Sequence, residues 1–201
     1  MHKTFLSYHH KNEQDLKEEL IEKHGGESFI DKSVSDGDIE ETNAEETIMR
    51  TIREDYLADS TVVVVLVGEK TALRKYVNSE IQAALWNKPT GLIAVVRNEI
   101  YDKIFSESTC SNNSCNCGIK LRRITSFYDD YMPYLVGANH RYANEAHTPH
   151  FEDNMVYCSV VKYSVFLNNP GKYIDAAFDK REKIEPSVKR NKEGVPVIGS
   201  N

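Results

Sequence analysis

The sequence predicts an α/β fold in which helices cover both faces of a doubly wound parallel sheet. Residues Val62 to Val67 are β-branched except for Leu66 and do not alternate with polar residues, which is typical of a strand buried on both faces. A helical pattern over 73–87 follows this run, and a second fully apolar run occupies 90–96. Apolar strands that alternate with helical patterns indicate parallel β-α units.

The preceding elements continue this alternation towards the N-terminus. They are predicted at residues 3–8 (strand), 11–26 (helix), 27–33 (short strand), 33–41 (loop) and 44–57 (helix). Leu16 and Leu20 have helical spacing, and Gly25 with Gly26 ends the first helix. Asn43 lies three residues before Glu46, which predicts a capping box at the start of the second helix.

The second half of the chain gives weaker signals. We expect a polar loop at 106–118, and residues 124–151 show no clear period. Residues 156–167 fit either a last strand or the start of a helix, and 171–184 fit a helix. No linker divides the chain. We therefore predict a single domain over 1–184, with a core at 1–97, an elaboration at 98–184 and a C-terminal tail at 185–201.

Composition narrows the class of protein. The chain has 201 residues, 40% of them hydrophobic and 28% charged, which fits a folded globular protein. The net charge of −6, without a basic block, argues against a nucleic-acid partner. No apolar stretch reaches the length of a membrane span or a signal peptide, so we expect a cytoplasmic protein without a membrane partner.

The cysteines allow two interpretations. They occur at Cys110, Cys115, Cys117 and Cys158, and three histidines lie between them, at His140, His147 and His150. These side chains could bind structural zinc, but the spacing lacks a C-x2-C pair. Reduced thiols are favoured in a cytosolic protein, so no metal site is predicted.

Several polar side chains follow the predicted strands. In an open α/β sheet, ligands bind outside the carboxyl ends of the strands, near the point where strand order reverses. The residues at or after these ends are Ser7, Tyr8, His9 and His10 for the first strand, Asp31 and Ser33 for the second, and 68–74 for the third. Glu80 follows on the next helix, so we expect hydroxyls, imidazoles and one carboxylate around a single cleft.

Common catalytic motifs are absent from the sequence. There is no G-x-G-x-x-G, G-x-S-x-G or H-E-x-x-H, and the GEKT stretch at 68–71 lacks the glycines of a phosphate loop. A dinucleotide-binding fingerprint, a serine hydrolase elbow and a zinc protease helix are therefore not indicated.

Two stretches carry a resemblance to a known family. FLSYHHKNEQD at 5–15 resembles the first-strand motif of Toll/interleukin-1 receptor (TIR) domains. DSTVVVVLVGEKTALRKYVNSEI at 59–81 resembles their third strand and third helix, although Tyr76 stands where the family usually has tryptophan. The match is closer to the TIR-like proteins of bacterial Thoeris anti-phage systems. This resemblance implies a TIR-like, flavodoxin-like sheet with a C-terminal elaboration.

The resemblance also implies an enzyme that acts on NAD. Glu80 would be the catalytic residue. The substrate-binding candidates are Phe5, Ser7, Tyr8, His9, Asp31, Ser33, Arg74 and Tyr76. The family implies a cyclic ADP-ribose-type product that activates a separate NAD-depleting effector, a phage component as trigger, and possible self-association of TIR-like domains.

Other interpretations stay open at the sequence level. Glu80 could be an ordinary surface glutamate, and Ser7 and Tyr8 could simply cap and pack the end of a strand. The domain could be a non-catalytic interaction module that only assembles with other TIR domains. A flavodoxin-like ligand binder or phospho-acceptor is a third alternative, since the βα order is similar. A phospho-acceptor is disfavoured, because it needs clustered acidic residues where this chain has Ser7-Tyr8 and Val67-Gly68.

Overall fold

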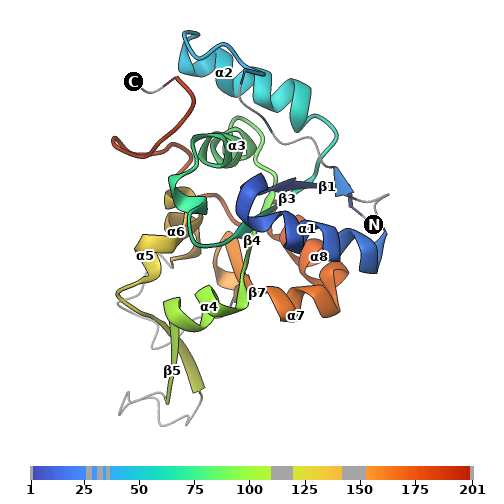
Figure 1. Ribbon diagram of the computed structural model, residues 1–201, viewed down its shortest axis with the longest axis vertical. Helices are drawn as coiled ribbons and strands as arrows, with labels where there is room; N and C mark the ends of the chain where they lie inside the picture. Colours follow the sequence, from blue (N-terminus) through green and yellow to red (C-terminus); the bar gives the residue numbers. More distant parts are fainter. Residues whose placement is uncertain are drawn as a thin grey trace.

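A five-stranded parallel sheet forms the centre of the protein, with the order β2-β1-β3-β4-β7 (Figure 1). The computed structural model describes residues 2–25, 29–30, 34, 37–109, 120–141 and 153–199. The strands are β1 (Thr4–Ser7), β2 (Phe29–Ile30), β3 (Val62–Val67), β4 (Gly91–Val96) and β7 (Cys158–Lys162). The predicted doubly wound parallel sheet is confirmed.

Helices cover both faces of this sheet. One face packs against α1 (His10–His24), α7 (Tyr163–Asn168) and α8 (Pro170–Lys180). The other packs against α2 (Glu45–Thr51), α3 (Lys75–Leu85), α5 (Tyr128–Tyr131) and α6 (Tyr134–His140). Two separate apolar layers result, and β3 and β4 between them are fully buried, as their unbroken apolar runs predicted.

The first strand distributes its side chains between the two layers. Phe5 belongs to the apolar layer under α3, whereas Leu6 and Tyr8 belong to the layer under α1. Successive side chains of a strand point to opposite faces, so Ser7 shares the face of Phe5. The last residue of β1 therefore points towards α3, and this alternation decides which residues meet at the edge of the sheet.

The start of α2 differs from the prediction. Ala44, not Asn43, is the N-cap residue, and its side chain makes no capping hydrogen bond. The Asn43 backbone N–H instead donates to Glu40 O at 3.2 Å, which places Asn43 in the turn before the helix. The predicted capping box is therefore wrong. The helix then continues as a π-helical segment, Ile52–Tyr56.

The second half adds elements that the sequence analysis did not predict, and residues 106–109, expected at the start of a polar loop, belong to a strand instead. Helix α4 (Asn98–Ile104) leads into an antiparallel hairpin of β5 (Phe105–Thr109) and β6 (Lys120–Ile124), which projects from the body of the protein (Figure 1). Residues 156–167 contain both predicted alternatives, since β7 is followed directly by α7. Helices α5 and α6 were missed because four and seven residues are too short to show a helical period.

The segment after α8 returns to the face of the sheet that carries α3. Residues 185–199, expected as a tail, run alongside α2 and α3 in an irregular conformation (Figure 1). Ile198 is only 1% exposed and belongs to the apolar layer under α3. The segment thus contributes to the core, although it has no regular secondary structure.

Candidate functional site

The order of strands reverses at β1, because β2 lies on one side of it and β3 on the other. The crevice outside the carboxyl ends of β1 and β3 is the place where open α/β sheets bind ligands. Ser7 is the last residue of β1, and Glu80 lies near the middle of α3, which crosses this end of the sheet.

Glu80 makes two hydrogen bonds at this point. Its Oε2 accepts from the Ser7 hydroxyl at 2.5 Å, and its Oε1 accepts from the Val34 backbone N–H at 2.7 Å. The side chain is 1% exposed, and Val34 is 3% exposed. Glu80 is therefore a buried carboxyl group that joins α3, the end of β1 and the segment after β2.

Burial controls the protonation of this group. Desolvation raises the pKa of Glu80 to about 8, although the hydrogen bonds from Ser7 and Val34 lower it. In the described part of the chain, no lysine, arginine or histidine forms an ion pair with Glu80. A cation that enters the crevice would stabilise the charged form, so proton release and cation binding are coupled at this residue.

The other predicted substrate-binding residues are more dispersed. Phe5 is fully buried in the apolar layer, and Tyr8 is 3% exposed, with its hydroxyl donating to Gln14 Oε1 at 3.2 Å. His9 is the N-cap residue of α1. Burial is the main cause that lowers the pKa of its imidazole, with Arg74 the largest charge effect. Phe5 and Tyr8 are thus packed in the apolar layers on opposite faces of the sheet, and His9 precedes the first turn of α1.

Arg74 and Tyr76 lie at the start of α3. Arg74 is its N-cap residue, and the Tyr76 hydroxyl donates to Glu41 Oε1 at 3.3 Å. Asp31 and Ser33 lie outside the described residues. Among the predicted residues, the structure therefore joins Ser7 directly to Glu80, whereas Arg74 and Tyr76 flank the helix that carries it.

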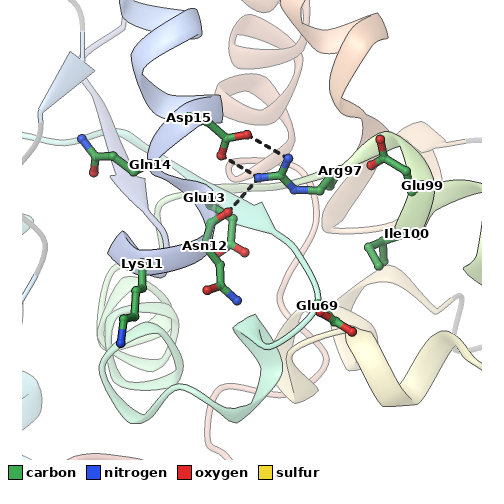
Figure 2. A pocket seen from close by; sticks show the side chains of 9 residues that line it. All are labelled: Lys11, Asn12, Glu13, Gln14, Asp15, Glu69, Arg97, Glu99 and Ile100. Atoms are coloured by element: carbon green, nitrogen blue, oxygen red, sulfur yellow. Dashed lines mark hydrogen bonds and ion pairs between the residues drawn. The ribbon is translucent and has the colours of Figure 1, made fainter.

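A wider cavity opens at the same edge of the sheet, between the start of α1, the end of β3 and the start of α4 (Figure 2). Its volume is about 810 Å³, and it is lined by Lys11, Asn12, Glu13, Gln14, Asp15, Glu69, Arg97, Glu99 and Ile100. This lining does not include Glu80. The single cleft expected from the sequence is therefore divided into a closed carboxylate site and an open polar cavity.

Most residues of the cavity were not among the candidates of the sequence analysis, and Arg97 is one of them. Arg97 donates two hydrogen bonds to the Asp15 carboxylate, at 2.9 and 2.6 Å, and a third to Asn12 O at 2.7 Å (Figure 2). Arg97 directly follows β4, so inspecting the fourth strand end as well as the first three would have found it.

Glu13 is another cavity residue that the sequence analysis missed, and it is fully buried at the start of α1. Its Oε2 accepts from the His9 N–H at 3.1 Å, and its Oε1 has no hydrogen-bond partner among the described residues. A Cβ placed on Gly68 would lie 2.1 Å from Oε1. The absence of a side chain at Gly68 therefore leaves room for the Glu13 carboxyl. A glycine directly after a buried strand is the feature of the sequence that could have indicated this close contact.

The same region carries a family match. Residues 5–100 match the model of the TIR-like domain of the Thoeris protein ThsB. The chain contains a ThsB-type TIR-like domain. The match extends from β1 into α4 and includes Ser7, Val34 and Glu80. The comparison with curated proteins gives no match.

The resemblance noted in the sequence is thereby confirmed for the TIR-like domain. No helix within the described ranges is long and apolar enough to cross a membrane. The same part of the chain contains no group of three or more histidine, cysteine or acidic side chains arranged for a metal. Cys158 is buried in β7, whereas Cys110, Cys115 and Cys117 lie outside the described residues.

Proposed function

We propose that this protein cleaves the N-glycosidic bond of NAD, with Glu80 as the catalytic residue. The observation that carries the proposal is the buried Glu80 carboxyl, which is bonded to Ser7 at the strand-order reversal of a ThsB-type TIR-like domain. We further propose that the product is a cyclic ADP-ribose-type messenger, made during anti-phage defence, which activates a separate NAD-depleting effector.

The chemistry requires only one carboxylate. The nicotinamide of NAD is already cationic, so it takes the electron pair of the C–N bond and departs neutral without a general acid. The ribose becomes oxocarbenium-like, and a carboxylate placed beside it stabilises that charge. Attack by water gives ADP-ribose and a proton, whereas attack by a nucleophile of the same molecule gives a cyclic product.

The protonation state of Glu80 fits a cationic substrate. Burial raises the pKa of this carboxyl to about 8, so much of the free protein holds it neutral at pH 7. A bound pyridinium cation favours loss of that proton. Binding of NAD and formation of the catalytic carboxylate would then be linked, and the free site would avoid burying an unpaired charge.

Access to Glu80 requires an exchange of hydrogen bonds. Both carboxyl oxygens already accept bonds, from Ser7 and from the Val34 N–H. Ribose hydroxyls are hydrogen-bond donors and would replace one of these two groups. We propose that the trigger, a phage component, favours this exchange, and that the protein has low activity without it.

A second candidate function follows from the same burial. Glu80 is 1% exposed with both oxygens bonded, as expected of a structural residue that holds α3 against the sheet. Under this alternative the protein is a TIR-type interaction module that assembles with other TIR-like domains, and it does not cleave NAD.

The test is incubation of the full chain with NAD in extract from phage-challenged cells, with products separated by chromatography and identified by mass spectrometry. Glu80→Gln keeps the size of the side chain and removes its charge. Glu46→Gln, an exposed position on α2, is the matched control. We expect nicotinamide release by wild type and Glu46→Gln, and a loss of about 100-fold or more in Glu80→Gln.

The outcomes separate the two candidates. Folded Glu80→Gln that releases nicotinamide at the wild-type rate removes Glu80 from the mechanism. Absence of release by wild type in challenged extract, together with concentration-dependent self-association, supports the interaction module. The mass of the ribosyl product distinguishes ADP-ribose from a cyclic product, since cyclisation excludes one water.

A further inference from the structure

Helix α3 is buried on the side that faces away from the sheet. Asn78, Ser79 and Gln82 are polar, and their exposed fractions are 1%, 0% and 1%. In a helix that covers a sheet, such residues normally form a solvated outer face. Here another part of the chain must cover them, because buried polar groups require hydrogen-bond partners.

The C-terminal segment supplies several of those partners. The Asn191 backbone N–H and its Nδ2 donate to Gln82 Oε1 at 2.8 and 3.0 Å, and Nδ2 also donates to Asn78 O at 3.2 Å. Asn78 Nδ2 donates to Pro196 O at 3.0 Å. Ile198 N–H donates to Ser79 Oγ at 2.9 Å. Five hydrogen bonds therefore join residues 191–198 to one face of α3.

The segment is also attached to the neighbouring helices. Asn139 of α6 donates to Val188 O at 2.7 Å and accepts from Val188 N–H at 3.3 Å. Arg190 pairs with Glu45 of α2, and Glu45 Oε1 also accepts from Gln82 Nε2 at 2.6 Å. The segment is thus also fixed to α2 and α6, and its contact with Glu45 of α2 is shared with Gln82 of α3.

These attachments lie on both sides of Glu80 in the sequence. Asn78 and Ser79 precede it and Gln82 follows it, so the anchored stretch includes the residue itself. At 100° per residue, position 80 points away from the anchored face and towards the edge of the sheet. Fixing that outer face limits rotation and sliding of α3, and these motions would move the Glu80 carboxyl away from Ser7.

We propose that residues 190–198 are a positioning element for Glu80, with Asn191 as the positioning residue that fixes the rotation of α3. The inference rests on the proposed function in so far as it concerns catalysis. Its structural part concerns the carboxyl alone and can be measured without any substrate.

The test compares Asn191→Asp with Asn168→Asp in the full chain. At position 191 the substitution keeps the size and replaces the donor NH₂ by an acceptor oxygen that faces the oxygens of Gln82 and Asn78. Asn168 is exposed at the end of α7 and provides the same chemical change far from α3. Ile198→Ala, which leaves the hydrogen bonds of Asn191 in place and removes apolar contacts of the segment with the core, is a second variant, used if Asn191→Asp does not fold.

Two measurements need no activity. We expect amide hydrogen exchange across 77–85 to become at least ~10-fold faster in Asn191→Asp. In a carbon-13 NMR titration of this variant, the pKa of Glu80 should fall from about 8 towards that of an ordinary glutamate, because water reaches the loosened carboxyl. Asn168→Asp should leave both unchanged. Ile174→Ala, a core change on the other face of the sheet, controls for a general loss of stability.

A third measurement addresses catalysis. For NAD cleavage, we expect kcat to fall by about 10-fold in Asn191→Asp, with KM within about twofold of wild type. Unchanged exchange and titration in Asn191→Asp and Ile198→Ala would overturn the proposal, as would equal changes in Ile174→Ala. Wild type that does not cleave NAD in extract from phage-challenged cells overturns the proposed function, while exchange and titration still decide whether the segment positions Glu80.

Discussion

Ser7 Oγ lies 2.5 Å from Glu80 Oε2 and thereby joins the end of β1 to the middle of α3. The contact spans 73 residues of sequence and exists because Ser7 shares the strand face of Phe5. The Val34 N–H completes the coordination of the carboxyl. The protonation state of Glu80 therefore determines the charge of this site, and burial keeps the carboxyl protonated to an unusually high pH.

The pH dependence of stability should report this proton. The folded pKa of Glu80, about 8, lies above the ordinary value of 4.5, so the folded state binds more protons than the unfolded state between those two pH values. Wild type should therefore lose up to ~1.4 kcal/mol per pH unit from this group as pH rises from 5 to 8. Glu80→Gln, which is neutral throughout, should be more stable relative to wild type at pH 8 than at pH 5.

Urea unfolding of both proteins at pH 5, 6.5 and 8 measures this difference. Glu46→Gln, on the exposed side of α2, should follow the wild-type curve. A constant difference between Glu80→Gln and wild type over the whole range would show that the carboxyl titrates alike in the folded and unfolded states.

Gly68→Ala should destabilise the protein through Glu13. The new methyl carbon would lie 2.1 Å from Glu13 Oε1, and both residues are buried. We expect a loss of about 1–3 kcal/mol in the free energy of unfolding, typical of overpacking. Thermal or urea unfolding measures the loss.

A double-mutant cycle tests the cause of that loss. Glu13→Ala creates space, so adding Gly68→Ala to it should cost at least ~1 kcal/mol less than adding it to wild type. Gly171→Ala is the matched control, because a Cβ there meets only Asn169 Oδ1, at 3.9 Å. Additive effects of the two substitutions would mean that Gly68 is required for another reason.

Lys180 should stabilise the end of α8 against β7. Its Nζ donates to Ser159 Oγ at 2.7 Å and to Asp153 O at 2.9 Å, and the residue is 6% exposed. Lys180→Met keeps the aliphatic stem and removes the three-donor group, and we expect it to cost about 1–3 kcal/mol in urea unfolding. Lys172→Met, exposed on the same helix, should have little effect; equal losses would argue against the buried contacts.

The Cys158 thiol should be unreactive in the folded protein. It is fully buried in β7, and burial raises the pKa of the thiol to about 12, so almost no thiolate forms at pH 8. Maleimide treatment followed by peptide mass spectrometry should label Cys158 only after unfolding in urea. Labelling of Cys158 in native protein at a rate typical of free cysteine would show that β7 opens readily.

The sequence predicted the core of the fold because its signals are local. Composition predicted the two strands, from the apolar runs at Val62–Val67 and 90–96, and the spacing of apolar residues predicted the helix between them. Neither signal requires tertiary information. The capping box at Asn43 was wrong because a turn hydrogen bond to Glu40 competed for that residue. Glu80 was predicted as the catalytic residue through the family resemblance and stays a prediction, whereas Arg97 and Glu13 were not named as candidates.

The sequence by itself determined the alternation of strands and helices and the parallel sheet, and it placed Ser7 and Glu80 among the candidate site residues. Only the tertiary structure decided that Glu80 is buried, bonded by Ser7 and the Val34 N–H, and separate from the lining of the open cavity. It also decided that residues 190–198 cover the outer face of α3. Periodicity describes one element at a time, whereas burial and protonation depend on atoms that are distant in the chain.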